Sequence, residues 1–294
     1  MKLQTEERNK NSLKIDELDT RNILITINNE DKTVAEKVEA EIDNISKVVD
    51  LLSSSMAKGG RIIYLGAGTS GRLAILDSAE CPPTYGTSPD EIVALIAGGN
   101  EAILKAIENS EDSEIQAIED LDKLNLKEND VIIGIAASGK TPYVIEGIKY
   151  AKSIGLNTVA IACNKNTIIG SLADLKIEVD TGPEVIMGST RMKAGTAQKL
   201  ILNMISTAVM IKLGKVYSNL MINVGSYNKK LLERQKIIVQ EATNCTYEQA
   251  EETLNKTNSN CKLAIYSILS GLNVENARKN LEKYNENIKK ALNI

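Results

Sequence analysis

The sequence of 294 residues contains no histidine and only four cysteines. Without histidine there is no imidazole base and no histidine metal ligand, so any proton transfer falls to carboxylates, lysine, tyrosine or cysteine. The cysteines lack the short spacing of a metal site; they are Cys81, Cys163, Cys245 and Cys261. We therefore expect free thiols in a reducing cytoplasm and no metal site.

The chain also lacks a long apolar run and an excess of basic charge. Its most apolar stretch, Leu200–Leu213, is interrupted by Asn203, Ser206 and Lys212, so no segment is expected to span a membrane. The first residues show no signal-peptide pattern. A net charge of −4 and a pI near 5.3 argue against a nucleic-acid-binding surface. A hydrophobic content of 43% is typical of a globular protein with one large or two modest domains.

A short apolar run followed by three closely spaced glycines organises the chain. Arg61–Leu65 is typical of a buried strand, and a helix is predicted over Arg72–Glu80 until Cys81-Pro82-Pro83 ends it. The glycines between them allow a tight turn in which the backbone can approach a ligand; they are Gly66, Gly68 and Gly71.

This turn has the properties of an anion-binding loop. Thr69 and Ser70 supply hydroxyls, and the helix N-terminus supplies free N–H groups and a positive dipole end, so we expect a phosphate here, close to Gly68. Dinucleotide-binding proteins share this glycine spacing, but they carry an acidic residue at the end of the second strand. The second predicted strand, Ile92–Ala97, ends in glycine instead. A glycine turn that only connects strand and helix is the alternative.

A second loop repeats this arrangement. Ser138, Gly139 and Thr141 follow a strand predicted over Asp130–Ala136, and Thr141 is expected to cap a helix over Pro142–Ser153. The loop also fits the P-loop pattern of nucleotide-binding proteins. Because the centre of that pattern is apolar and typical of a strand interior, we regard an ATPase as the weaker alternative.

A third loop carries Ser189 and Thr190 and leads into a long apolar helix predicted over Ala194–Leu213. On its own, this loop fits a solvated basic turn equally well. The carboxyl ends of parallel strands lie at one edge of a sheet, and ligands bind there. Three hydroxyl-bearing loops at that edge therefore predict a phosphate site more strongly than any one of them.

The order of the predicted elements defines the fold class. Strands that alternate with helices are typical of βαβ units, which form a parallel sheet with helices on both faces. The remaining elements of this region are predicted as strands at Asn157–Ala162 and Leu175–Val179 and as helices at Glu101–Glu108 and Ser113–Leu124.

Helices are expected on both sides of this region in the sequence. The capping box Thr33–Glu36 predicts the start of an N-terminal helix, and the β pattern ends after about residue 225. Three short helices follow as a small bundle, the first capped by Thr246, the second running from Asn258-Ser259 to Gly271 and the third capped by Asn273. We expect one domain over residues 1–225 and another over residues 226–294.

Several longer stretches together resemble one enzyme family. They read LGAGTSGRLAILDSAECPPTYG from Leu65, LIAGG from Leu95, GIAASGKTPYV from Gly134 and GPEVIMGSTRMKAGTAQKLILNM from Gly182. In this order they are similar to the bacterial N-acetylmuramic acid 6-phosphate etherases of the sugar-isomerase (SIS) superfamily, to which the glucokinase regulatory protein is also similar. The resemblance extends over nearly the whole chain, including the opening Thr5-Glu6-x-Arg8-Asn9.

The resemblance implies a fold, a reaction and two catalytic residues. The fold is an αβα sandwich of flavodoxin-like type with a UBA-like helical C-terminal domain, in a cytoplasmic homodimer without a cofactor. The reaction is cleavage of the lactyl ether at C3 of a phosphosugar, which releases D-lactate and N-acetylglucosamine 6-phosphate in cell-wall recycling. Glu80 in SAECPP matches the family's proton donor, and Glu111 in ENSEDS matches its second active-site glutamate.

The places of these glutamates in the sequence agree with such roles. Glu80 is expected at a helix C-terminus, where the negative dipole end favours a protonated acid, and Glu111 lies just before a helix start, which favours an ionised base. Without the resemblance, the acidic run around Glu111 is typical of solvated surface. The alternatives are a non-catalytic sugar-phosphate-binding regulator, whose C-terminal bundle meets a partner protein, and a phosphosugar isomerase.

Overall fold

The computed structural model describes residues 3–224 and 229–293. The chain divides into two compact units, one made of Met1–Ser78 and Pro89–Ser206 and the other of Ala79–Ser88 and Thr207–Ile294. The boundary expected between residues 225 and 226 lies outside the described residues. Among the described residues, no helix combines the length and the apolar character needed to cross a membrane.

The first unit is built on a five-stranded parallel sheet in the order β2-β1-β3-β4-β5. This is the order of flavodoxin-like folds and confirms the expected α/β class. The strands are β1 (Ile62–Gly66), β2 (Ile92–Ile96), β3 (Val131–Ile135), β4 (Asn157–Ala162) and β5 (Leu175–Glu178). Gly66 at the end of β1 pairs with Ile96 and Ile135, so the loops after these three strands leave the sheet at the same edge.

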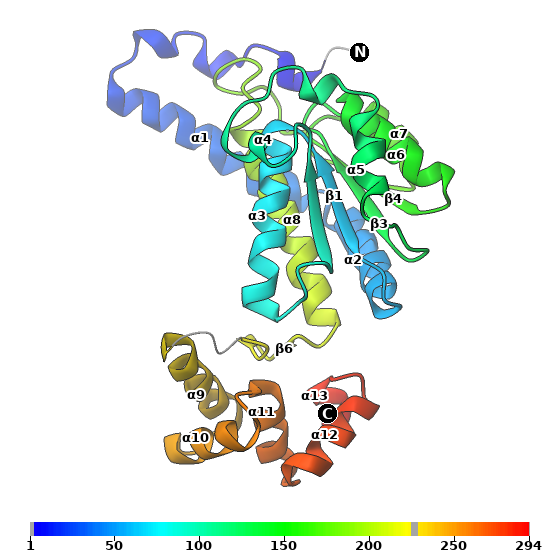
Figure 1. Ribbon diagram of the computed structural model, residues 1–294. Helices are drawn as coiled ribbons and strands as arrows, with labels where there is room; N and C mark the ends of the chain where they lie inside the picture. The colour runs from blue at the N-terminus through cyan, green and yellow to red at the C-terminus, as the bar shows by residue number, and fades with distance from the viewer. Residues whose placement is uncertain (1–2, 225–228, 294) are drawn as a thin grey trace. The chain divides into compact units, whose positions relative to one another are not determined.

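Helices cover both faces of this sheet (Figure 1), with α5, α6 and α7 on one face and α2, α3 and α8 on the other. The helices of this region are α1 (Thr20–Glu39), α2 (Ile42–Ala57), α3 (Gly68–Tyr85), α4 (Glu101–Leu104), α5 (Gln116–Asp122), α6 (Pro142–Ser153), α7 (Ile168–Leu172) and α8 (Lys193–Lys212). On the α6 face, Leu65, Val144 and Ile148 are fully buried together. On the α3 face, the buried Tyr64 hydroxyl donates to Asp77 at 3.0 Å.

The N-terminal helix differs from the prediction. α1 starts at Thr20 because the Asp19 carboxylate accepts the Asn22 N–H at 2.9 Å and so caps the helix. Thr33 lies inside α1, where its hydroxyl donates to the Glu30 carbonyl at 2.7 Å. The predicted capping box at Thr33–Glu36 is therefore wrong, because a hydroxyl bonded to the preceding turn leaves the helix uninterrupted.

The prediction that two prolines end α3 is also wrong. α3 begins at Gly68 and passes through Pro82 and Pro83 to Tyr85. The prolines lack N–H donors, but their carbonyls still accept, and the Gly86 N–H donates to Pro82 O at 2.9 Å. Gly86 has a φ of 64°, so the helix ends at the left-handed glycine that follows it.

The second unit contains more helices than the three that were predicted. Its elements are the hairpin of β6 (Val216–Tyr217) and β7 (Leu220–Met221), followed by α9 (Lys229–Thr243), α10 (Tyr247–Lys256), α11 (Cys261–Ser270), α12 (Val274–Lys283) and α13 (Ile288–Leu292). Thr246 and Asn273 cap α10 and α12 as expected, and Gly271 ends α11 in a left-handed conformation. α11 begins later than predicted because the Asn260 side chain, not Ser259, accepts the Leu263 N–H.

Candidate functional site

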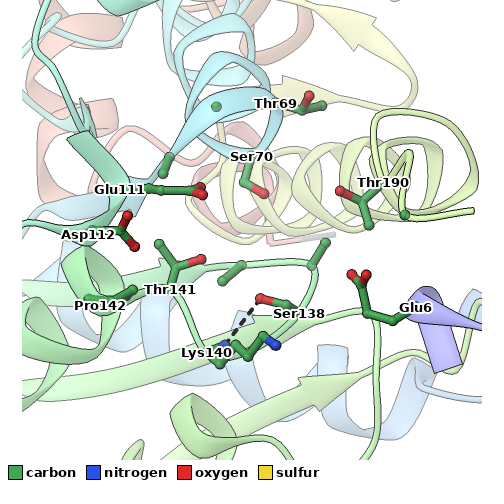
Figure 2. A pocket seen from close by; sticks show the side chains of 15 residues that line it. Glu6, Thr69, Ser70, Glu111, Asp112, Ser138, Lys140, Thr141, Pro142 and Thr190 are labelled. Atoms are coloured by element: carbon green, nitrogen blue, oxygen red, sulfur yellow. Dashed lines mark hydrogen bonds between the residues drawn. The ribbon is translucent and has the colours of Figure 1, made fainter. Parts of the chain in front are cut away.

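A pocket of about 550 Å³ lies at the carboxyl edge of the sheet, between the three predicted loops. Figure 2 shows its polar side chains converging from several elements of the first unit. The lining comes from Ala67–Ser70, from Glu111 and Asp112, from Ala136–Ser138 and Lys140–Pro142, from Gly188 and Thr190, and from Glu6.

The first loop brings the N-terminus of α3 to the pocket. A Cβ at Gly71 would lie 2.5 Å from the Ile96 side chain, so only glycine lets this first turn pack closely against β2. Ser70 is buried, and its hydroxyl donates to the Gln198 amide oxygen of α8 at 3.0 Å. The Gln198 amide nitrogen is buried without a hydrogen-bond partner among the described residues. If the amide turns over, its nitrogen donates to Ser70 and frees the Ser70 proton for a ligand.

The second loop brings the N-terminus of α6 to the same pocket. Thr141 occupies the N-cap position in an extended conformation with Pro142 as the first helical residue, as predicted. Its side chain makes no capping bond, so the hydroxyl is available to the pocket, which it faces in Figure 2. Gly134, the first glycine of the P-loop pattern, lies inside β3 and pairs with Ala160. The P-loop interpretation therefore fails, because that loop needs open backbone where this chain forms a strand.

The loop after β2 carries two carboxylates. α4 ends at Leu104, four residues earlier than predicted, and the Arg72 guanidinium of α3 binds the carbonyls of Ile103 and Lys105, each at 3.0 Å. The short helix η4 (Ser110–Asp112) follows and holds the exposed Glu111 and Asp112. In Figure 2 the Glu111 carboxylate points towards Ser70.

The third loop is held by a buried carboxylate. Glu184 accepts the N–H groups of Lys193 and Ala194 at 3.0 and 2.9 Å, which fixes the start of α8, and burial raises the pKa of this glutamate. The Lys193 ammonium is itself buried and pairs with Glu30 at 2.6 Å. Thr190 reaches the pocket from this loop, whereas Lys193 is committed to its ion pair and does not line it.

The structure brings together seven of the ten predicted site residues. Those that line the pocket are Gly68, Thr69, Ser70, Glu111, Ser138, Thr141 and Thr190. Gly139 does not line the pocket. It has a φ of 69° and lines a neighbouring cavity together with Thr167. Ser189 does not line the pocket either. Glu80 is exposed on α3, ten residues beyond Ser70, which is about 15 Å along the helix axis.

Sequence reasoning gave no role to two carboxylates that line this pocket, Glu6 and Asp112. Asp112 adjoins Glu111 in the same acidic run, and nothing in the sequence distinguishes it from the other carboxylates of that run. Glu6 belongs to the N-terminal stretch that contributes to the family resemblance without indicating a role for this residue. Nothing in its local pattern indicated that it meets loops more than 100 positions away.

The pocket combines anion binding with carboxylate bases. The N-termini of α3 and α6 and the hydroxyls of Ser70, Ser138 and Thr141 form one polar cradle. Glu111 and Glu6 face it from opposite sides in Figure 2. Lys140 is an exposed lysine in the lining, and its backbone N–H donates to Ser138 Oγ at 3.3 Å. The arrangement fits a phosphorylated ligand that loses protons to carboxylates.

Comparisons with known proteins agree with the fold and show the family. A family model described as the glucokinase regulatory protein N-terminal SIS domain matches residues 44–152, and the SIS domain model matches residues 110–208. A protein of Clostridium beijerinckii named N-acetylmuramic acid 6-phosphate etherase is 53% identical over 290 residues, covering 99% of this chain and 95% of its own. A protein of Bacillus mycoides with the same name is 52% identical and covers 99% of both chains.

Solved structures support the fold alone. A phosphoheptose isomerase from Francisella tularensis superposes with a TM-score of 0.51 at 13% identity, covering 66% of this chain and 100% of its own. A protein of E. coli CFT073 gives a TM-score of 0.50 at 17% identity, covering 69% of this chain and 97% of its own.

Proposed function

The chain belongs to the N-acetylmuramic acid 6-phosphate etherase family, and we propose that it cleaves the D-lactyl ether of N-acetylmuramic acid 6-phosphate by elimination and hydration. The products are N-acetylglucosamine 6-phosphate and D-lactate. The observation that carries this proposal is the Glu111 carboxylate facing the polar cradle of Ser70, Ser138 and Thr141. We expect the reaction in the cytoplasm as part of cell-wall sugar recycling, in keeping with four free cysteines.

The cradle binds the 6-phosphate in this proposal. The first residues of α3 and α6 line the pocket, and the positive ends of both helices favour a dianion there. The Thr141 hydroxyl has no capping bond to give up, so it donates to a phosphate oxygen at no cost to the helix. The Ser70 hydroxyl can also donate to the phosphate if the Gln198 amide turns over, because the Gln198 nitrogen then donates to Ser70.

Glu111 is the base that removes the proton from C2. In the open-chain sugar this carbon lies beside the C1 aldehyde, so its proton is acidic and the ether oxygen on C3 is a leaving group. Glu111 is exposed and lines the pocket with its carboxylate turned inwards, which leaves it accessible to a bound sugar. Lys140, the one lysine or arginine among the described residues that line the pocket, is suited to stabilise the developing negative charge on the aldehyde oxygen.

Glu80 is the acid that protonates the departing lactate oxygen, and a second copy of the chain brings it to this pocket. Within one chain, Glu80 lies about 15 Å along α3 from Ser70, beyond the reach of a glutamate side chain. The same helix exposes 51% of Leu76, and its neighbour α8 exposes 39% of Met204. The Asn203 side-chain amide of α8 donates to the Asp77 carboxylate of α3 at 2.8 Å. This apolar face is suited to a homodimer contact in which Glu80 acts across the interface.

Two single variants test the roles of the glutamates. Glu80→Gln should still exchange the C2 hydrogen with solvent deuterium but release little lactate, because the base remains and the acid is lost. Glu111→Gln should lose both, and each loss should be about 10²–10⁴-fold. Proton exchange is followed by NMR beside a lactate assay. Exchange that survives only in Glu111→Gln would reverse the two roles.

A mixing experiment tests the dimer. Glu80→Gln and Glu111→Gln subunits are combined, unfolded together and refolded. If each site takes one glutamate from each subunit, half of the dimers are mixed and carry one intact site, so roughly a quarter of the wild-type lactate release returns. No recovery on mixing would place both glutamates in the same subunit or exclude the dimer.

The same lactate assay separates the other two candidate functions. A phosphosugar isomerase would interconvert an aldose and a ketose phosphate and release no lactate. A non-catalytic regulator would bind the phosphosugar without exchanging the C2 hydrogen. The carboxylates facing the cradle favour the etherase, because a binding protein for a phosphorylated ligand has no need of negative charge beside it.

A further inference from the structure

The proposed elimination leaves one proton transfer without a residue. In the closed ring of the sugar there is no carbonyl beside C2, so the C2 proton is not acidic until the ring opens to the C1 aldehyde. Ring opening removes a proton from the C1 hydroxyl and delivers one to the ring oxygen, before Glu111 or Glu80 can act. Isolated sugars open slowly in water, and this chain has no histidine to catalyse the step.

A third carboxylate lies in the pocket in a suitable place. Figure 2 shows Glu6 turned into the pocket near Thr190 and Ser138, on the side opposite Glu111. The loop at Gly188 lies beside this side chain, since a Cβ at that position would be at an ordinary contact distance of 3.5 Å from Glu6 Oε2. Among the described residues Glu6 forms no ion pair, so its charge is not committed to a structural partner.

The N-terminal segment is anchored so that Glu6 stays in the pocket. Thr5 is fully buried, and Asn164, two residues after the end of β4, is 2% exposed. The Asn164 side-chain oxygen accepts the N–H groups of Gln4 and Thr5 at 2.8 and 3.3 Å. Its amide nitrogen donates to Thr5 Oγ1 and to the Ala137 carbonyl, both at 3.0 Å. One buried side chain thus ties the residue before Glu6 to the residue before Ser138.

A second set of contacts fixes the rest of this segment to the loop before α8. The Asn9 amide donates to the Pro183 carbonyl at 3.2 Å, and the Ser12 hydroxyl donates to the Val185 carbonyl at 2.8 Å. Both side chains are buried. These contacts fix the segment that carries Glu6, whose half-buried side chain lines the pocket.

We propose that Glu6 is the catalytic residue that opens the sugar ring, on the premise of the etherase function above. One carboxylate oxygen takes the proton of the C1 hydroxyl as the C1–O5 bond breaks, and the electron pair of that bond goes to O5. Glu6 then passes the same proton to O5, so C1 becomes an aldehyde and the carboxylate is restored. The two oxygens on C1 are spaced like the two oxygens of a carboxylate, so one group serves both. Glu111 next removes the C2 proton.

The partial reaction can be measured without the ether. N-Acetylglucosamine 6-phosphate carries no lactyl group, and its α and β anomers interconvert only through the open chain. We expect the wild-type protein to accelerate this interconversion in exchange NMR spectra. Glu6→Gln should reduce the acceleration by about 10²-fold or more, the usual contribution of a general base.

Controls separate catalysis from folding. Glu7→Gln removes the neighbouring carboxylate, which does not line the pocket, and should leave anomer exchange unchanged. Glu6→Asp keeps the charge and should recover part of the rate. The affinity for N-acetylglucosamine 6-phosphate is measured on the same samples, and a loss of exchange explained entirely by weaker binding would overturn the proposal.

Two other results would also overturn it: a wild-type protein that does not accelerate anomer exchange, and a Glu6→Gln variant that exchanges anomers at the wild-type rate. Lactate release by the wild-type protein is assayed separately. Absence of lactate would refute the etherase function, whereas lactate release with exchange independent of Glu6 would refute only the ring-opening role.

Discussion

Removing the side chain of Asn164 tests whether the N-terminal segment is part of the site. In Asn164→Ala, four groups lose a hydrogen-bond partner: the Gln4 and Thr5 N–H groups, the Thr5 hydroxyl and the Ala137 carbonyl. Each buried group left without a hydrogen bond costs about 1–3 kcal/mol. Because Gln4 is exposed and water can reach part of the space that the amide leaves, we expect a total near the lower end, about 3 kcal/mol.

This energy acts on the attachment of the segment more than on the sheet. A change of about 3 kcal/mol shifts an attachment equilibrium by roughly 100-fold. We expect trypsin to cleave the variant quickly at Arg8, Lys10 and Lys14, and kcat/KM for lactate release to fall by up to about 100-fold. Urea unfolding of the first unit should change by less than the full 3 kcal/mol, because β4 keeps its pairing with β3.

The matched control is an asparagine at the start of the strand that precedes Asn164. Asn157 begins β4 with an exposed side chain, so Asn157→Ala should behave like the wild-type protein in both assays. An Asn164→Ala variant that keeps wild-type resistance to trypsin and wild-type lactate release would refute the argument that this side chain positions Glu6. Loss of activity in both variants would point to a general loss of folding instead.

Three further predictions concern the cradle and the two units. Ser70→Ala should weaken phosphosugar binding by about 1–3 kcal/mol in calorimetry, and unchanged affinity would place the phosphate elsewhere. Burial alone would raise the pKa of Asp130, but hydrogen bonds from Arg61 and the Lys127 N–H hold it below its usual value. Asp130→Ala should therefore lower the free energy of unfolding, measured in urea at pH 7, by about 3–5 kcal/mol. A loss under 1 kcal/mol would contradict this. Burial lowers the pKa of Lys262 from 10.5 to about 8. Between these two pH values the unfolded chain binds more protons than the folded chain, so the second unit should become more stable as the pH rises from about 8 to 10.5. Lys262→Met should abolish this rise, and a pH-independent wild-type protein would refute it.

The sequence by itself determined the elements that repeat a local pattern. β4 and α6 begin and end where the apolar periodicity and the Thr141-Pro142 start signal placed them. The loops that line the pocket were predicted from glycines and hydroxyls beside helix starts, which are also local features. These patterns specify the class of site because backbone N–H groups at a helix N-terminus bind anions in any context.

Only the tertiary structure decided which charged groups belong to the site. Asn164 meets Gln4 across 160 positions of sequence, and that contact brings Glu6 into the pocket. Lys193 and Glu111 both occur in motif-like stretches, yet Lys193 is held by Glu30 whereas Glu111 faces the cradle. No local pattern distinguishes these cases, because the free energy that places a charged side chain comes from partners that are remote in the chain and adjacent only after folding.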